Sequence, residues 1–484
     1  MFMWDEAEYA SLGRSLIDDN SYTINQQPHA LRPPVLPIIN ALSFSIFGIG
    51  DTSAKIPIFL LALLSLCAIY LVMLKEFSEK IAIASSFFLG TIPLYLKHLG
   101  NNLAEIPFTF FYICSIFMFY YALNNNKKYF YPAWIFFGAA LMTRYNGLLI
   151  PLSVAIYGGL MFAASGNKKK YLQDLFSSKH FFMAPVIAFL IISPWYLYQY
   201  VAFGTPFKGL IMSSGQLASW ATVVGSASNY IYISWLPNLV SLPIFLLSLI
   251  GIAYMLAKRN SFLSYLMVNL LVVFLYFSLQ PSKDPRFMAQ LMPFFAIFAA
   301  VGLFKVLYPW LCRDINKKIV FMFLILGVSY VGFVNYSTAE ANYELSSAIG
   351  YPSLIQASSY VNSNTNANQV IVGASIPQYY WYSERVTHGY PQEEQDLFDF
   401  LSETEVSYIL LNNYERNQPQ YVMQLFAKGF FTDEGTLRYL EDAQELKIFG
   451  DLSKFNDPMM NPVTIVVPAD LFVERTQHLL NDTI

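Results

Sequence analysis

The 484-residue sequence has few charged residues. Asp, Glu, Lys and Arg make up 13% of it, about half the roughly 25% that is usual in soluble globular proteins. This shortage argues against a water-soluble enzyme and against a disordered chain. There are also few cysteines: Cys67, Cys114 and Cys312 are far apart, beside or inside apolar runs, with no CxxC motif and no Cys/His cluster. A disulfide framework or a structural zinc is therefore not indicated.

The charged residues are distributed unevenly along the chain. Residues 1–336 contain 22 Lys and Arg against 12 Asp and Glu, whereas residues 337–484 contain 7 against 20. This asymmetry predicts two parts in two environments. The basic residues form no continuous face, so a nucleic-acid partner is not expected.

Hydrophobic residues, 55% of the chain, gather into long runs between positions 54 and 336. Runs of about 16–22 residues have the length needed to cross a hydrocarbon core. The sequence predicts ten spans: 54–75, 80–97, 104–123, 129–143, 147–163, 180–201, 236–257, 261–279, 287–308 and 319–336.

Alternate short loops between these runs carry thirteen cations, from Lys75 to Lys318. Because cytoplasmic loops are enriched in Lys and Arg, they predict which side is cytoplasmic. Residues 1–53, 97–105, 202–235, 280–286 and 337–484 are then extracytoplasmic. Since an exported N-terminal segment needs a signal or a helix before it, we expect an upstream family helix that this sequence does not contain.

The acidic C-terminal part is expected to be a small α/β domain. Four segments have the pattern of strands: 369–375, 406–411, 446–449 and 463–467. Residues 391–403 and 420–431 have helical periodicity. No GxGxxG or Walker-type loop occurs here, so nucleotide binding is unsupported. Residues 379–382 (YYWY) could line a sugar site, but a packed core strand is the better interpretation.

Ionisable groups beside membrane spans are functional candidates, because burying them costs free energy. Asp5 and Glu6 lie in the first predicted exported loop and could supply a general base or a metal ligand, or simply begin a helix in solvent. Glu105 enters an apolar span from the exported side. A helix N-terminus alone would also favour a carboxylate there.

The exported side also carries cations where positive charge is normally sparse. Arg32 is followed by Pro33 and Pro34, which fix the backbone where a helix begins. It could hold a phosphate or anchor a lipid headgroup. The further cations of this kind are Arg144, Lys283 and Arg286. His29 and His98 are on the same side, but two separated histidines do not make a zinc site, and structural roles are expected.

Glycosyl transfer from a lipid phosphate needs this combination of groups. A carboxylate takes the proton of the attacking acceptor. The transition state at the sugar resembles an oxocarbenium ion. The departing phosphate gathers negative charge, which Arg and Lys can stabilise. The lipid tail needs an apolar groove between spans.

Several segments resemble one family of membrane enzymes. They are residues 5–17 (DEAEYASLGRSLI), 32–48 (RPPVLPIINALSFSIFG), 101–111 (NNLAEIPFTFF), 141–152 (LMTRYNGLLIPL), 193–207 (SPWYLYQYVAFGTPF) and 282–303 (SKDPRFMAQLMPFFAIFAAVGL). In this order they are similar to the C-type-fold glycosyltransferases, in the branch of dolichyl-phosphate-mannose protein mannosyltransferases and lipid A aminoarabinose transferases.

The resemblance implies an inverting transferase that uses a polyprenyl-phosphate-linked monosaccharide. Asp5 matches the family's essential carboxylate, with Glu6 beside it, and Glu105 stands where a second acidic residue occurs. Arg32, Lys283 and Arg286 match phosphate-contacting or basic positions. Glu8 and Leu31 depart from the aminoarabinose-transferase pattern, which argues against a lipid A acceptor and a bound zinc.

We therefore expect an α-helical polytopic membrane protein with a C-terminal extracytoplasmic α/β domain. Its expected parts are a first extracytoplasmic loop with the catalytic motif (1–53), a transmembrane helical domain (54–336) and the α/β domain (337–484). The predicted catalytic residues are Asp5, Glu6 and Glu105, and the predicted lipid-phosphate ligands are Arg32, Arg144, Lys283 and Arg286.

The predicted partners are a polyprenyl-phosphate sugar, a protein, lipid or glycan acceptor, and membrane lipids. A divalent cation at Asp5 and Glu6 is an open alternative to a base at that position. Two other functions are less well supported by the sequence. A transporter or lipid flippase should place ionisable groups near the middle of the membrane, whereas these lie at one face. A non-catalytic exported domain on a membrane anchor would not need ten spans.

Overall fold

The computed structural model describes residues 3–215, 228–313, 315–349, 352–413, 415, 418–430, 446–450, 463–477 and 479. The chain divides into two compact units. One comprises residues 29–341, and the other combines residues 1–28 with 342–484. Each is described by itself below.

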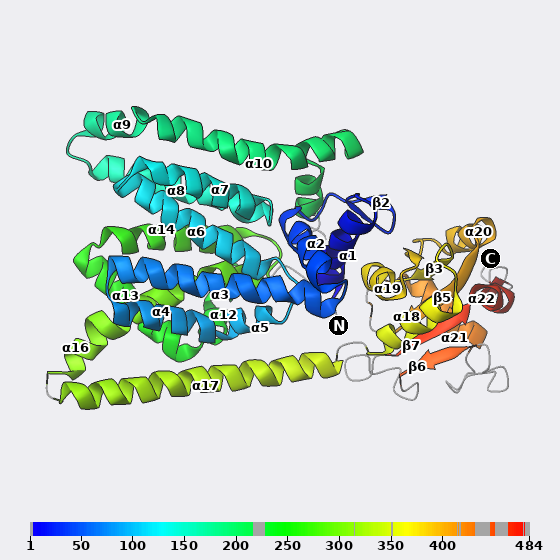
Figure 1. The fold of residues 1–484 in the computed structure, drawn as a ribbon. Coiled ribbons are helices and arrows are strands. Elements are labelled where there is room, and N and C mark those ends of the chain that lie inside the picture. Colours follow the sequence, from blue (N-terminus) through cyan, green and yellow to red (C-terminus); the bar gives the residue numbers. More distant parts are fainter. Residues whose placement is uncertain are drawn as a thin grey trace. The chain divides into compact units, whose positions relative to one another are not determined.

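The unit of residues 29–341 is built from helices (Figure 1). Helix α6 packs against α7 and α3, and α15 packs against α4 and α13. The helices are α2 (Val35–Phe47), α3 (Asp51–Glu76), α4 (Glu79–Thr91), α5 (Pro93–Leu99), α6 (Glu105–Asn124), η1 (Lys127–Tyr129), α7 (Phe130–Leu141), η2 (Tyr145–Leu148), α8 (Leu149–Ala164), α9 (Lys168–Phe176), α10 (Lys179–Phe203), α12 (Ile231–Val240), α13 (Leu242–Lys258), α14 (Ser261–Leu279), η3 (Pro285–Leu291), α15 (Met292–Val301), η4 (Gly302–Leu307), α16 (Tyr308–Leu311) and α17 (Lys317–Ile349).

Seven described helical segments are long and apolar enough to cross a membrane, and an eighth would be the pair α12 and α13, which bends by 110°. This confirms the predicted class of helical polytopic membrane protein, with fewer long spans than the ten predicted. The stretch 80–97 is divided at Ile92, because Pro93 begins a new helix, and the stretch 129–143 forms only the 12-residue α7.

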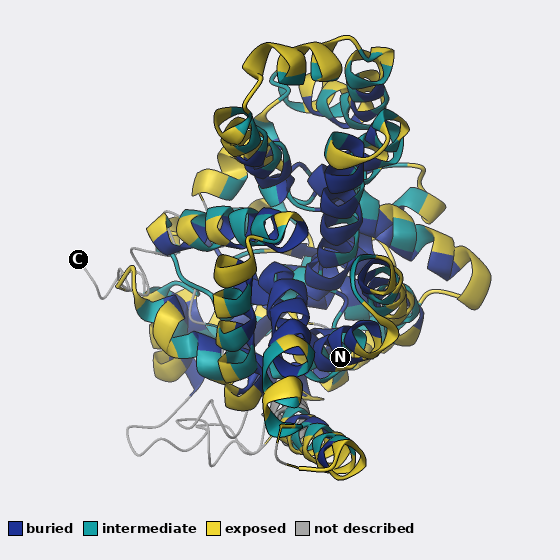
Figure 2. Cartoon of the chain, turned by 90° about the vertical axis from the view of Figure 1, so that its left-hand side faces the viewer, coloured by how far each residue is buried: buried dark blue, intermediate teal, exposed yellow. Residues whose placement is uncertain are grey.

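The spans differ sharply in burial (Figure 2). In the most apolar part of the segment Pro285–Leu311, 94% of residues are buried within the protein, against 17% in Lys179–Phe203 and in Lys317–Glu340. Most of the exposed side chains along these two segments are apolar, among them Phe189 and Phe323. Such faces suit lipid, which solvates apolar side chains as well as a protein core does.

The second unit contains a five-stranded sheet of order β4-β3-β5-β7-β6. Strand β3 (Val370–Gly373) is parallel to β4 (Val386–His388) and to β5 (Val406–Asn412), whereas β7 (Thr464–Pro468) is antiparallel to β5 and to β6 (Lys447–Phe449). The helices here are α1 (Trp4–Asp18), α18 (Pro352–Asn364), α19 (Ile376–Ser383), α20 (Glu394–Glu403), α21 (Gln420–Phe430) and α22 (Ala469–Thr476).

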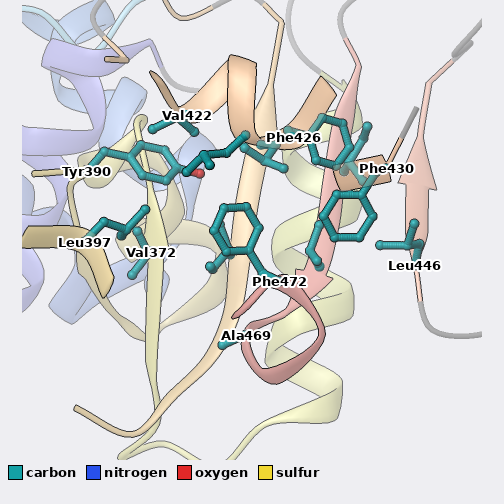
Figure 3. Close-up of a cluster of buried hydrophobic side chains, with 14 of the residues drawn as sticks. Val372, Tyr390, Leu397, Val422, Phe426, Phe430, Leu446, Ala469 and Phe472 are labelled. Carbon is teal, nitrogen blue, oxygen red and sulfur yellow. The ribbon is translucent and has the colours of Figure 1, made fainter. Parts of the chain in front are cut away.

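Alternation along the strands produces a core on each face of the sheet. Ile409 and Leu411 of β5 belong to one cluster with residues of α20, α21 and α22 (Figure 3). Leu410 faces the other way, into a cluster with residues of α18 and α19. The period of two in side-chain direction therefore yields three layers, helix, sheet and helix. The predicted α/β domain is confirmed.

Residues 379–382 are not a strand, as was predicted, but part of helix α19. Pro377 occupies the first turn of this helix, where its missing N–H costs nothing. Tyr379 is fully buried in the core, so its packing role holds although its secondary structure was wrong.

Helix α1 packs against α19, and Arg14 Nη1 lies 2.9 Å from Glu384 Oε1. The hairpin of β1 (Thr23–Ile24) and β2 (Gln27–Pro28) follows, and its turn residue Asn25 binds both the main-chain N–H and the carbonyl of Thr387. The N-terminal segment is thus held against the C-terminal α/β fold by specific polar contacts.

Candidate active site

Asp5 and Glu6 lie in the first turn of α1. The Glu6 carboxylate accepts a hydrogen bond from the Met3 main-chain N–H at 2.8 Å, and its side chain is 1% exposed. This contact satisfies one of the unpaired N–H groups at the helix start. Asp5 is half-buried. Glu6 therefore fixes the first turn on which Asp5 is carried.

Glu105 is the first residue of α6 and is 3% exposed. Arg144 Nη1 donates to its Oε1 at 2.5 Å. The helix N-terminus also favours the negative charge. A carboxylate this deeply buried needs such a partner, since an unpaired buried charge is very costly.

The turn after α7 brings Arg144 to Glu105. The Arg144 main-chain N–H donates to the carbonyl of Ala140 at 2.9 Å, which closes the end of α7. A Cβ on Gly147 would lie 2.7 Å from the Cα of Leu141, so only glycine allows the chain to return this closely. The sequence Thr143-Arg144-Tyr145-Asn146-Gly147 thus encodes the position of the guanidinium.

Arg286 reaches the same place from the η3 helix. Asp284 caps this helix by accepting from the Arg286 main-chain N–H at 2.9 Å, and its other oxygen lies 2.9 Å from Arg286 Nε. A narrow recess results, which we call the Glu105 recess. Its lining residues are Glu105, Phe108, Arg144, Asn146, Phe277, Arg286, Phe287, Ala289 and Gln290.

Lys283 has a different environment. Its ammonium donates to the carbonyls of Phe277, Ser278 and Gln280 at the end of α14. Cations at a helix C-terminus satisfy unpaired carbonyls and interact favourably with the helix dipole. Lys283 therefore caps the end of α14, and its charge also lies two residues before the start of η3.

Arg32 lies in a loop that side chains of the neighbouring helices hold in place. Tyr145 donates through its hydroxyl to the carbonyl of Ala30 at 3.2 Å, and Tyr198 to that of His29 at 3.3 Å. The main-chain N–H of Val35 donates to the carbonyl of Met142, two residues before Arg144. Burial, with the Arg32 charge as a smaller cause, lowers the pKa of His29 to about 3, so this histidine is neutral.

An apolar groove follows one face of α10 near this loop. Tyr196, Leu197 and Tyr200 line it, together with Phe189, Ile192, Ser193 and Pro206. Trp195, on the same helix, is buried, and its indole N–H donates to the Tyr145 hydroxyl at 3.2 Å.

The structure thus brings Glu105, Arg144 and Arg286 together, and it ties the Arg32 loop to the segment that carries Arg144. Asp5 and Glu6 belong to the other unit. Sequence reasoning missed Gln290, which lines the recess, and gave His98 only a structural role. A polar residue inside an apolar run, as Gln290 is in MAQLMPFF, was the signal that could have found it.

A divalent cation was an open alternative at Asp5 and Glu6. Within the described part of the chain, no group of three or more His, Cys, Asp or Glu residues could hold a metal ion. Glu6 is moreover engaged by the Met3 N–H. The described residues thus offer Asp5 and Glu6 no group of three His, Cys, Asp or Glu ligands for a metal ion.

Comparison with known proteins identifies a similar family over part of the chain, and a similar fold. Residues 31–198 match the family described as dolichyl-phosphate-mannose-protein mannosyltransferase. An uncharacterized protein of Aquifex aeolicus is 22% identical over 342 residues, which are 69% of this chain and 66% of that protein, so the matched region spans just under two thirds of that relative.

Solved structures cover nearly the whole chain. ArnT from Cupriavidus metallidurans bound to undecaprenyl phosphate superimposes with a TM-score of 0.68 at 15% identity, covering 96% of this chain and 93% of ArnT. The oligosaccharyltransferase AglB from Archaeoglobus fulgidus, in complex with an inhibitory peptide and a dolichol-phosphate, gives 0.56 at 13% identity, covering 98% and 73%.

These matches confirm the predicted resemblance to the C-type membrane glycosyltransferases of the mannosyltransferase and ArnT type. At these identities the structural matches establish the fold, and the family match covers residues 31–198. Together with the apolar helices, they make the chain a multi-pass membrane protein.

Proposed function

We propose that this protein is an inverting glycosyltransferase. It moves a monosaccharide from a polyprenyl phosphate to an acceptor at the extracytoplasmic face of the membrane. The observation that carries the proposal is the buried Glu105–Arg144 pair with Arg286 in the same recess, at the mouth of a span, in a chain with the ArnT fold.

Asp5 is the proposed catalytic base. The acceptor's oxygen or nitrogen attacks the anomeric carbon from the side opposite the phosphate, and its proton passes to the Asp5 carboxylate. The bond between the anomeric carbon and the phosphate oxygen breaks, and its electron pair stays on the phosphate. Glu6 supports Asp5 by fixing the first turn of α1.

Arg32, Arg144 and Arg286 are the proposed phosphate ligands. Arg144 uses one terminal nitrogen on Glu105, and Arg286 directs its Nε toward Asp284; a guanidinium has five N–H donors in all. Guanidinium groups stabilise the charge that gathers on the leaving phosphate. Lys283 contributes its charge nearby while its ammonium caps α14.

The apolar groove on α10 is the proposed site for the beginning of the lipid tail. Tyr198, on the same turn as the groove residues Leu197 and Tyr200, holds the loop that carries Arg32. A lipid whose phosphate contacts Arg32 could therefore run its chain along α10.

The ArnT structure contains undecaprenyl phosphate and the AglB structure a dolichol-phosphate, which supports a polyprenyl carrier of this kind. Another AglB structure is tethered to an acceptor peptide. A protein acceptor is thus one candidate, beside a lipid or a glycan.

The test is release of sugar from the carrier. The protein, purified in detergent, is given a panel of radiolabelled undecaprenyl-phosphate and dolichyl-phosphate monosaccharides together with a membrane extract that supplies acceptors. We expect label from one donor to leave the lipid in a protein-dependent way. If no donor loses label while the protein is folded and binds polyprenyl phosphate, the proposal is wrong.

A further inference from the structure

The Glu105 recess contains a polar group that the fold does not use. Gln290 lines it and is 5% exposed. Its amide nitrogen Nε2 has no hydrogen-bond partner among the residues that the structure describes. A buried N–H group without a partner is destabilising, so native proteins normally satisfy it, and a ligand is one way to do so.

The Glu105 carboxylate, which lines the same recess, can also accept further hydrogen bonds. In the described part of the chain, the Glu105 carboxylate takes one hydrogen bond, from Arg144 to Oε1. A carboxylate has about four acceptor positions on its two oxygens. The recess therefore presents an unused donor on Gln290 and unused acceptor capacity on Glu105. A hydroxyl group, which both accepts and donates, is complementary to this pair.

His98 gives a second, independent sign. It lies on α5, is 4% exposed, and neither ring nitrogen has a hydrogen-bond partner among the described residues. Its charged neighbours include Glu105, Arg144 and Arg286. Two buried side chains near Glu105, those of Gln290 and His98, thus have polar atoms that a ligand could satisfy.

The charges decide what kind of ligand group fits. Arg144 is paired with Glu105 and Arg286 with Asp284, so these four groups together carry no net charge. A phosphate inside the recess would be repelled by the Glu105 carboxylate, whereas a neutral hydroxyl can donate a hydrogen bond to it. As the structure stands, the recess has no room for a water-sized group, so the side chains that line it must move apart even for a single hydroxyl, and further for a phosphate or a whole ring.

We propose that the Glu105 recess is a carbohydrate-hydroxyl subsite, in which Glu105 accepts from and Gln290 donates to one hydroxyl of the sugar on the lipid donor. The inference rests on the proposed function. We assign the recess to the donor's sugar and not to the acceptor. The reason is that Arg144 and Arg286 line the same recess, and they are the proposed ligands of the phosphate to which this sugar is joined. Gln290 then helps to determine which sugar is used.

The experiment measures equilibrium binding to the full chain in detergent, with two kinds of lipid. One is undecaprenyl phosphate, and the other is undecaprenyl phosphate carrying a single hexose, taken from a panel of epimers. The variant Gln290→Met keeps the unbranched shape and removes the amide. The matched control is Gln280→Met, the same change at a half-buried glutamine outside the recess whose side chain makes no hydrogen bond to another described residue.

We expect the wild-type protein to bind its preferred sugar-lipid more tightly than undecaprenyl phosphate. Gln290→Met should weaken binding of the sugar-lipid about 3- to 10-fold, the effect of one hydrogen bond, and leave binding of undecaprenyl phosphate unchanged. Gln280→Met should change neither. If Gln290→Met does not fold, Gln290→Asn, which withdraws the amide by one methylene, should give the same selective loss.

Equal weakening of both lipids, or none, would overturn the subsite. If the wild-type protein prefers the sugar-lipid and Gln290→Met retains that preference, the subsite alone is wrong. If the wild-type protein binds neither lipid, the proposed function fails and the subsite fails with it.

Discussion

At the scale of single residues, the buried pair of Glu105 and Arg144 is the feature with the most direct consequences. Glu105 is 3% exposed, whereas the Arg144 side chain is 19% exposed. The two partners are therefore not equivalent. Removal of Arg144 leaves the Glu105 carboxylate buried without its ion-pair partner. Removal of the Glu105 charge leaves an arginine that is still partly exposed to solvent.

Arg144→Met is accordingly expected to lower the free energy of unfolding by about 3–5 kcal/mol, the cost of breaking a buried ion pair by removing one partner. Glu105→Gln should cost clearly less, because its amide is neutral and keeps the shape of the side chain. The double variant should be more stable than Arg144→Met. Thermal or denaturant unfolding in detergent measures all three, and equal losses in the two single variants would contradict this asymmetry.

The stability of the C-terminal α/β fold is expected to depend on pH through Glu415. Burial raises the pKa of this carboxyl, and a hydrogen bond from the Ser375 hydroxyl at 2.7 Å offsets only part of the shift. The unfolded chain then releases this proton at a lower pH than the folded chain does. As pH rises above about 4.5, the ordinary value, folding therefore loses stability, until the folded-state pKa has been passed.

Glu415→Gln should remove this loss. We expect it to increase hydrogen-exchange protection of β3 and β5 at pH 7 in the full chain, with a smaller gain at pH 4.5, after correction for intrinsic exchange rates. Glu405→Gln, on the exposed surface before β5, serves as the control. A gain that is the same at both pH values would argue against a raised pKa.

At the scale of elements, α14 ends in carbonyls that Lys283 satisfies. Lys283→Met should lower stability by about 0.3–1 kcal/mol, the usual contribution of a cation at a helix C-terminus. Arg286→Met should weaken binding of undecaprenyl phosphate more than Lys283→Met does. Lipid binding and thermal midpoint together separate the two roles, and a larger binding loss for Lys283→Met would assign the phosphate to the lysine instead.

The crossing of α13 with α15 and η4 depends on two glycines. A Cβ on Gly251 would lie 1.9 Å from the carbonyl oxygen of Phe298, and one on Gly302 would lie 2.2 Å from that of Leu247. Close approach of helix backbones through small residues is how membrane helices associate.

Gly251→Ala should therefore force the helices apart and cost at least about 1–3 kcal/mol. Gly159→Ala is the matched control, since a Cβ there meets nothing within 4 Å and alanine favours a helix. Thermal midpoints in detergent compare them. Similar stability of the two variants would show that the crossing can widen freely.

Elements whose signal is local could be predicted from the sequence. Apolar runs rich in β-branched residues correctly predicted strands β3, β5 and β7. The three-residue β4 was missed because Val386-Thr387-His388 has no such run. The aromatic cluster at 379–382 favours strand by propensity, but tertiary packing of α19 decides it. Pro93 was visible as well, yet its effect on span 80–97 depends on whether neighbours satisfy the freed carbonyl.

Individual residues of the site could be predicted from the sequence, but their arrangement in space could not. Glu105 and Arg144 were identified one by one, because each is an unusual charge at the exported end of an apolar run. Their pairing across 39 positions could not be derived from spacing, since it depends on the turn at Gly147 and on how α6 packs against α7. Gln290 was missed because an amide carries no charge to attract notice.

At the scale of the whole molecule, the proposed reaction needs Asp5 on helix α1 as well as the arginines of the helical unit. In this mechanism Asp5 takes the acceptor's proton during sugar transfer. Because a single carboxylate has this role, one substitution tests it.

The most direct test is single-turnover transfer of radiolabelled sugar from the preferred polyprenyl phosphate donor, comparing the wild-type protein with Asp5→Asn. Asp18→Asn, on the same helix and exposed, is the control. We predict that Asp5→Asn binds the donor with unchanged affinity and transfers at least about a hundredfold more slowly, as expected for loss of a general base, while Asp18→Asn is unaffected. Transfer by Asp5→Asn at the wild-type rate would contradict the account.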